Sequence, residues 1–184
     1  MARTESAMLA LGTSAPDFAL TDVVTGKQVT TQAVTGQKGL LVMFICRHCP
    51  FVKHLEKALA QLGRDYAGKG IGIVAISSND ADNYPDDAPE SLAQQARDLG
   101  FSFPYLYDES QDVARGYDAA CTPDFFLFDG GLKLGYRGQF DDSRPGNGIP
   151  VTGRDLRGAI DALLQVRPIS PDQRPSIGCN IKWK

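Results

Sequence analysis

The stretch GLLVMFICRHCPFVKHLEKALAQL, residues 39–62, decides the fold. It opens with a short, continuous apolar run, which is typical of a buried central strand. Over residues 51–62 the apolar positions recur on one face of a helix, and His54 falls on the other face, where we expect it to be solvated. The pair Cys46 and Cys49 therefore lies where a buried strand passes into an amphipathic helix.

The rest of the chain alternates apolar runs with amphipathic segments and predicts an α/β protein. Parallel strands joined by helices are followed by an antiparallel hairpin and a last helix, so we expect a central mixed sheet flanked by helices. The last helix is expected to have Thr152 as its N-cap and Asp155 in its first turn. The predicted strands are 17–20, 27–30, 39–45, 71–77, 103–107, 124–128 and 132–138, and the other predicted helices are 89–99 and 152–166.

Length and composition are those of one globular domain. The 184 residues are expected to form a single domain over 1–167, with 168–184, which contains three prolines, as a tail packed on it. The 19 basic and 22 acidic residues give a net charge of −3, so we expect neither nucleic acid nor a membrane as partner. The first residues lack the basic and apolar regions of a signal peptide, which predicts a cytoplasmic protein.

The Cys46 and Cys49 pair has the spacing and the setting of a redox-active dithiol. A thiol at a helix N-terminus faces unpaired backbone N–H groups and the positive end of the helix dipole, and both favour the thiolate. Arg47 and His48 add positive charge, and such surroundings lower a cysteine pKa. Residues i and i+3 of a first turn are close enough to close a disulfide. Because Pro50 has no N–H, the first turn is either loosened or begins nearer Cys49.

A metal site is the alternative interpretation of a CxxC motif. Zinc sites usually add a second pair of ligands at regular spacing, whereas Cys121 and Cys179 stand alone in this sequence. We therefore predict no metal and no cofactor. A protein that binds zinc, copper or an iron–sulfur group through Cys46, Cys49 and Cys121 remains a third candidate.

Several blocks of the sequence resemble the thioredoxin-like superfamily. Thr122-Pro123 resembles its cis-proline loop, which lies against the CxxC motif and supports the active site. The opening Ala15-Pro16-Asp17-Phe18 resembles peroxiredoxins of the alkyl hydroperoxide reductase and thiol-specific antioxidant group. The resemblance implies a thioredoxin-like fold with an N-terminal peroxiredoxin-type extension. The blocks most similar to a peroxiredoxin-like branch are FICRHCPFVKHLE, YPDDAPE, FPYLYDESQDVARGY, CTPDFFLFD and PSIGCNIKWK.

Departures from this pattern bear on the reaction. Peroxiredoxins carry a threonine or serine three residues before the attacking cysteine, where this chain has Met43, and an arginine just before the strand that 124–128 would form. Arg47 and Arg137 are the possible replacements. These losses favour a thiol–disulfide oxidoreductase in which Cys46 attacks and Cys49 releases the product through a mixed disulfide. The alternative is an antioxidant thiol peroxidase with Cys46 peroxidatic and Cys49 resolving.

The expected partners follow from that chemistry. They are protein or small-molecule disulfides, or peroxides in the alternative, together with an electron donor that resets the thiols. Cys121 and Cys179 are candidate additional redox thiols, although each has an equally plain explanation as a packed side chain. Asp124 is a candidate proton acceptor for Cys49, or else an exposed acid at the start of a strand.

Overall fold

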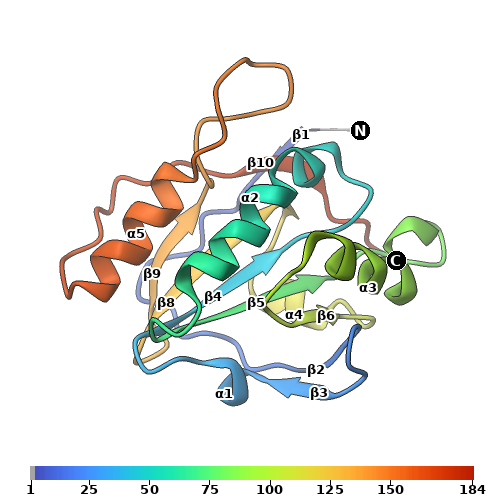
Figure 1. The fold of residues 1–184 in the computed structure, drawn as a ribbon, viewed down its shortest axis with the longest axis horizontal. Coiled ribbons are helices and arrows are strands. Elements are labelled where there is room, and N and C mark those ends of the chain that lie inside the picture. Colours follow the sequence, from blue (N-terminus) through green and yellow to red (C-terminus); the bar gives the residue numbers. More distant parts are fainter. Residues whose placement is uncertain (1–2) are drawn as a thin grey trace.

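A seven-stranded mixed sheet forms the centre of the molecule (Figure 1). The computed structural model describes residues 3–184. The strand order is β3-β2-β6-β5-β4-β8-β9; β4, β5 and β6 run parallel, and β8 and β9 form an antiparallel hairpin beside β4. The predicted α/β class and mixed sheet are confirmed. The strands are β2 (Ala19–Asp22), β3 (Gln28–Thr30), β4 (Gly39–Phe44), β5 (Ile71–Ser77), β6 (Tyr105–Tyr107), β8 (Asp124–Asp129) and β9 (Leu134–Gly138).

A second, three-stranded sheet lies beside the first and was not predicted. Its order is β1 (Arg3–Glu5), β10 (Ile177–Asn180) and β7 (Cys121–Thr122), with antiparallel pairing throughout. Segments from both ends of the described chain therefore meet at the strand that precedes Pro123.

Helices cover both faces of the large sheet. Because successive side chains of a strand point to opposite faces, the apolar side chains of its strands are buried on both sides. Leu41 and Met43 of β4 pack in one cluster with α2, α3 and α5, whereas Val42 and Phe44 pack in the other with α4. The helices are α1 (Thr31–Val34), α2 (Pro50–Tyr66), α3 (Pro89–Leu99), α4 (Asp112–Gly116) and α5 (Arg154–Leu164), and a 3-10 turn, η1, spans Pro85–Asp87.

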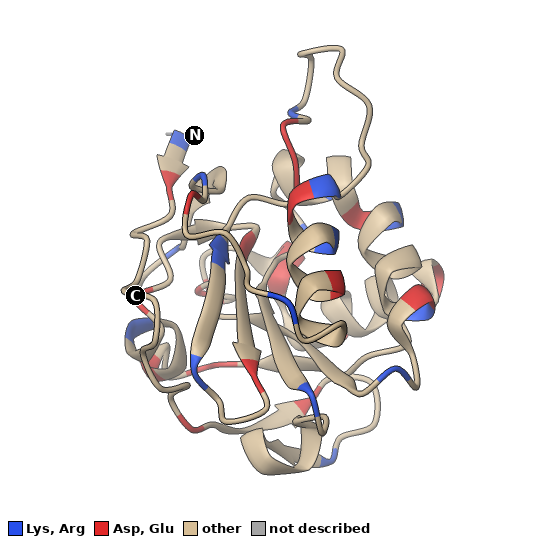
Figure 2. Ribbon diagram, turned by 90° about the vertical axis from the view of Figure 1, so that its left-hand side faces the viewer, with Lys and Arg blue, Asp and Glu red and all other residues tan. Residues whose placement is uncertain are grey.

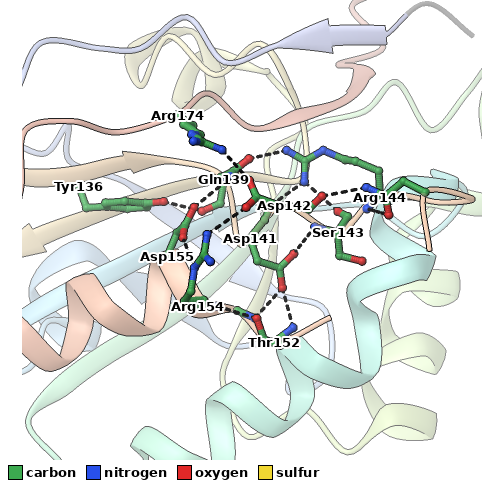
Figure 3. A network of polar contacts seen from close by, with 12 residues as sticks. Tyr136, Gln139, Asp141, Asp142, Ser143, Arg144, Thr152, Arg154, Asp155 and Arg174 are labelled. Carbon is green, nitrogen blue, oxygen red and sulfur yellow. Dashed lines mark hydrogen bonds and ion pairs between the residues drawn. The ribbon is translucent and has the colours of Figure 1, made fainter. Parts of the chain in front are cut away.

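Helix α5 begins later than predicted. Its N-cap is Gly153 in a left-handed conformation, not Thr152. The carboxylate of Asp141 accepts the backbone N–H groups of Thr152 and Gly153, at 2.7 and 2.6 Å, and so fixes the chain just before the first turn of the helix. Figure 3 shows this network, in which Asp142 also pairs with Arg174 of the tail at 3.0 Å.

Charged residues are dispersed over the described surface. In the view of Figure 2, Lys and Arg positions are interspersed with Asp and Glu positions on the helices and loops. Among residues 3–184, no helix combines the length and the apolar character that crossing a bilayer requires.

Candidate active site

Cys46 and Cys49 lie in the short connection between β4 and α2. Pro50 is the first residue of α2, where its missing N–H costs no helical hydrogen bond, and Cys49 is the N-cap. The second of the two arrangements considered for Pro50 is therefore the one present. Both thiols are fully buried.

Cys49, at the start of α2, has the lowered pKa of the pair, and Cys46 has the raised one. A hydrogen bond from the Cys46 thiol, assisted by the backbone N–H of Val52, lowers the pKa of Cys49 to about 5. Burial raises the pKa of Cys46 well above its usual value, and the hydrogen bond to Cys49 and the negative charge of Asp87 raise it further. The pKa values of the two thiols are therefore shifted in opposite directions.

The loop at Thr122-Pro123 lies against both sulfurs. The Thr122–Pro123 peptide bond is cis, as the resemblance implies. The Thr122 hydroxyl shares a hydrogen bond of 3.3 Å with Cys46 Sγ, and the Thr122 carbonyl oxygen lies 3.3 Å from Cys49 Sγ. One residue of this loop therefore contacts each member of the pair.

A buried carboxylate that was not singled out from the sequence organises the motif. Asp87 is fully buried and accepts the backbone N–H groups of Arg47 and His48, at 2.8 and 3.1 Å. Its other oxygen accepts His48 Nδ1 and the side-chain amide of Asn79. Burial opposes ionisation of Asp87, but these donors outweigh it and lower its pKa. Asp87 therefore holds the two residues between the cysteines in place as an anion.

A pocket opens beside His48. The imidazole stacks on the ring of Tyr84, with centroids 5.5 Å apart, and its Nε2 is buried without a hydrogen-bond partner among the described residues. The pocket, called here the Tyr84 pocket, has a volume of about 350 Å³ and a mainly apolar lining. A larger cavity of about 390 Å³ lies beside α5, away from the cysteines. The Tyr84 pocket is lined by His48, Asn83, Tyr84, Pro85, Asp86 and Lys182.

The two arginines considered as replacements for a peroxiredoxin arginine are directed elsewhere. The guanidinium of Arg47 donates to the Ser91 carbonyl on α3. The guanidinium of Arg137 donates to the Leu9 carbonyl and to Gln173. Neither makes a hydrogen bond to a thiol among the described residues.

The remaining cysteines differ in their relation to the pair. Cys179 of β10 is buried, and its Sγ lies 2.8 Å from Cys49 Sγ. Burial, with the hydrogen bond to Cys49, raises the pKa of Cys179 to about 12. Cys121 is also buried, but its thiol is directed to the Pro123 carbonyl, at 3.6 Å. Of the two candidate extra thiols, the structure brings Cys179 into contact with the pair.

Two polar residues differ from their predicted surroundings. Asp124 is fully buried, not exposed; it accepts the Ser6 hydroxyl at 2.8 Å and the Ala120 N–H at 3.3 Å. Burial raises the pKa of Asp124 to about 7, because these donors compensate only in part. His54 is half-buried, not solvated, because its Nε2 bonds the Ser143 hydroxyl of the long loop before α5, at 2.7 Å.

The metal-binding alternative is not supported by the donor set. The described residues with ligand atoms gathered within 4.8 Å of one another are Cys46, His48 and Asp87, not the predicted three cysteines. The Asp87 oxygens already accept four N–H groups, which leaves them poorly available to a cation. The cluster is therefore a hydrogen-bonded support for the CxxC motif.

This combination of fold and site defines the class of protein. A CxxC motif between a strand and a helix, facing a cis-proline loop, is the arrangement of thioredoxin-fold redox proteins. The thioredoxin domain of a thiol-disulfide oxidoreductase from Bacteroides vulgatus superposes with a TM-score of 0.65 at 21% identity, over 85% of this chain and 99% of that one. The chain thus has the thioredoxin fold.

The chain belongs to the AhpC/TSA family, whose profile matches residues 11–137. It is 28% identical to the thiol-disulfide oxidoreductase ResA of Geobacillus kaustophilus over 126 residues, 68% of this chain and 67% of that protein. The crystal structure of an uncharacterized conserved protein from the same organism is 57% identical, with a TM-score of 0.98 over 100% of this chain and 97% of that one. The predicted relationship to thioredoxins and peroxiredoxins is confirmed.

Proposed function

We propose that this protein is a thiol–disulfide oxidoreductase that exchanges disulfides with its substrates through Cys46 and Cys49. The observation that carries the proposal is the pair of buried thiols itself, held at the start of α2 and contacted on both sulfurs by Thr122. Disulfide exchange requires one thiol that attacks the substrate and a second thiol nearby that releases the product.

Cys46 is the thiol that meets the substrate in this proposal. Its sulfur lies within 4.8 Å of ligand atoms of His48 and Asp87, and His48 lines the Tyr84 pocket. Cys49 lies on the opposite side, beneath β10. Because burial raises the pKa of Cys46, attack requires that the Cys46 thiol give up its proton, and the neighbouring Cys49 sulfur is the proposed acceptor.

The electrons balance in two steps. The Cys46 thiolate attacks one sulfur of a substrate disulfide, a mixed disulfide forms, and the other substrate sulfur leaves as a thiolate. Cys49 then loses the shared proton to that leaving thiolate and attacks Cys46 Sγ. The second substrate thiol is released and a Cys46–Cys49 disulfide remains. The substrate has gained two electrons, and a dithiol donor resets the protein.

Reduction of a model protein disulfide tests the assignment. We expect Cys46→Ser to reduce the rate at least about 1,000-fold, because the nucleophile is gone. Cys49→Ser should accumulate the mixed disulfide on Cys46, which mass spectrometry detects. Cys121 is equally buried, but its thiol is directed to the Pro123 carbonyl and not to the pair. Cys121→Ser is therefore the matched control and should keep wild-type activity. Full activity in Cys46→Ser, or trapping on Cys49 in that variant, would contradict the assignment of roles.

A thiol peroxidase is the second candidate, favoured by the AhpC/TSA match and by the lowered pKa of Cys49. The placement of Arg47 and Arg137 argues against it, because neither guanidinium is in position to polarise a peroxide at the thiols. The rate of thiol oxidation by hydrogen peroxide, compared with the rate of exchange, separates the two. Faster oxidation by peroxide that is lost in Cys46→Ser or Cys49→Ser would establish the peroxidase.

The identity of the substrates and the cytoplasmic location stay predictions. We propose protein or small-molecule disulfides as substrates, since the Tyr84 pocket is mainly apolar and offers the buried, unpartnered Nε2 of His48 beside it.

A further inference from the structure

The sulfur of Cys49 has two thiol neighbours, one on each side. It accepts a hydrogen bond from Cys46 within the CxxC motif, and it lies 2.8 Å from Cys179 Sγ. A disulfide bond measures about 2.05 Å, so the two sulfurs need to approach by less than about 1 Å to become bonded. Cys179 therefore occupies the place of a second resolving thiol.

The contact between Cys179 and Cys49 is held by the surrounding backbone. In the β10–β7 pair Cys179 stands opposite Thr122, the residue that touches both active-site sulfurs. The close approach depends on Gly178, since a Cβ there would lie 1.9 Å from the Thr122 carbonyl oxygen. Any side chain at position 178 would push β10 away from the cysteines.

Hydrogen bonds on both sides of Cys179 fix β10. Before the strand, the Ser176 hydroxyl donates to the Pro123 carbonyl at 2.6 Å, and the Ser176 N–H donates to Ser6 at 2.9 Å. After it, the Lys182 N–H donates to Asn79 at 2.9 Å, and the Lys182 carbonyl accepts the side-chain amide of Gln111 at 2.8 Å. The sulfur is thus presented to Cys49 by an anchored strand.

We propose that Cys179 is a third redox thiol, which transfers the disulfide from Cys46–Cys49 to Cys49–Cys179. The Cys179 sulfur attacks Cys49 Sγ, the Cys49–Cys179 bond forms, and the Cys46–Cys49 bond breaks. The electron pair leaves with Cys46, which takes up the proton released by Cys179. There is no net oxidation, so no further reactant is needed. The proposal rests on the proposed function, which supplies the first disulfide.

The transfer has a defined consequence for the site. The oxidised form then carries its disulfide beneath β10, and Cys46 is again a thiol close to His48, which lines the Tyr84 pocket. Cys121 takes no part, because it stands opposite Asn180 in the sheet and its thiol is directed to Pro123. It is therefore the control for effects of removing a buried thiol from this sheet.

Peptide mapping of the oxidised protein tests the proposal. Reduced full-length protein is oxidised with excess glutathione disulfide, quenched in acid to stop exchange, alkylated and digested with trypsin. Cleavage after Arg47 separates Cys46, in peptide 39–47, from Cys49, in peptide 48–53. The Cys46–Cys49 and Cys49–Cys179 disulfides then give different linked peptides.

The expected result is that wild type yields both the Cys46–Cys49 and the Cys49–Cys179 linked peptides. Cys46→Ser should convert Cys49 entirely to the Cys179 link, Cys179→Ser should leave only the Cys46–Cys49 link, and Cys121→Ser should match wild type. Absence of the Cys49–Cys179 peptide from wild type overturns the proposal, even if it forms in Cys46→Ser. If wild type lacks the Cys49–Cys179 peptide but yields the Cys46–Cys49 peptide, the proposed function stands and only the transfer to Cys179 is refuted. If wild type yields neither peptide, the proposed function fails as well.

Discussion

On one side of the cysteine pair a polar cluster borders an open pocket, whereas on the other side a strand of the protein covers the sulfur. The Cys46 side is built on Asp87 and leads to the Tyr84 pocket, and the Cys49 side is built on β10 and its Cys179. Each side also has one buried carboxylate, Asp87 or Asp124. Asp87 accepts four N–H groups and has a lowered pKa, while Asp124 accepts Ser6 and Ala120 and has a raised one. The two buried carboxylates thus have opposite pKa shifts, because the groups around Asp87, His48 among them, outweigh its burial and those around Asp124 do not.

Substitution of Gly178 by valine is expected to have the largest effect, because it displaces β10, the strand that covers the Cys49 side of the pair. The new side chain meets the Thr122 carbonyl, and overpacking of this kind costs about 1–3 kcal/mol. That cost shifts an opening equilibrium about 5–150-fold, and the alkylation rate of Cys49 should rise accordingly. Gly158→Ala on α5, where a Cβ meets no atom within 4 Å, is the control. An unchanged rate in the Gly178 variant would show that β10 does not limit access.

Asp87→Asn tests the charge on the Cys46 side. Removing a buried anion with four donors should lower the free energy of unfolding by about 2–3 kcal/mol at pH 7, measured by urea denaturation. Because the folded pKa of Asp87 is lowered, its contribution is present above about pH 4 and is lost as the pH falls through the folded value. The deficit of the variant should therefore shrink in acid, and a deficit that is constant with pH would contradict the anionic role.

Asp124→Asn is expected to have the smallest effect and the opposite pH dependence. A raised folded pKa means that the stabilising contribution is complete below about pH 4 and is lost as the pH rises to about 7. Relative to wild type, the variant should gain stability between pH 4 and pH 8. Urea denaturation at these two pH values measures the gain. Parallel pH profiles for the two proteins would show that Asp124 is ionised throughout.

The sequence predicted the elements whose signals are local. The apolar run before the CxxC motif, the helix after it and the cis-proline loop each depend on adjacent residues, and each is present. The helical pattern predicted from the sequence covers residues 51–62, yet α2 continues through Gly63 to Tyr66, and Gly63 leaves room for the ring of Phe103. Gly63 therefore allows a close contact with a distant residue, and the neighbouring sequence alone does not reveal this role.

Features that depend on distant partners were missed for the same reason. Asp87 stands beside Asp86 in YPDDAPE, and only the fold selects the one that reaches the CxxC motif. β10 is a short stretch, IGCN, without alternation, whose partners lie near residues 4 and 122. The cap of α5 depends on Asp141, 11 and 12 residues away from the N–H groups that it accepts. In each case the signal is a contact and not a pattern.

The late position of β10 in the chain bears on how the protein is made. Cys179 is synthesised 130 residues after Cys49, and at about 5–20 residues per second this interval lasts roughly 10 s. During that time the nascent chain already has both CxxC thiols but neither the covering strand nor its cysteine. The CxxC thiols of the growing chain are therefore more open to oxidants than those of the folded protein, and the arrival of β10 ends that exposure.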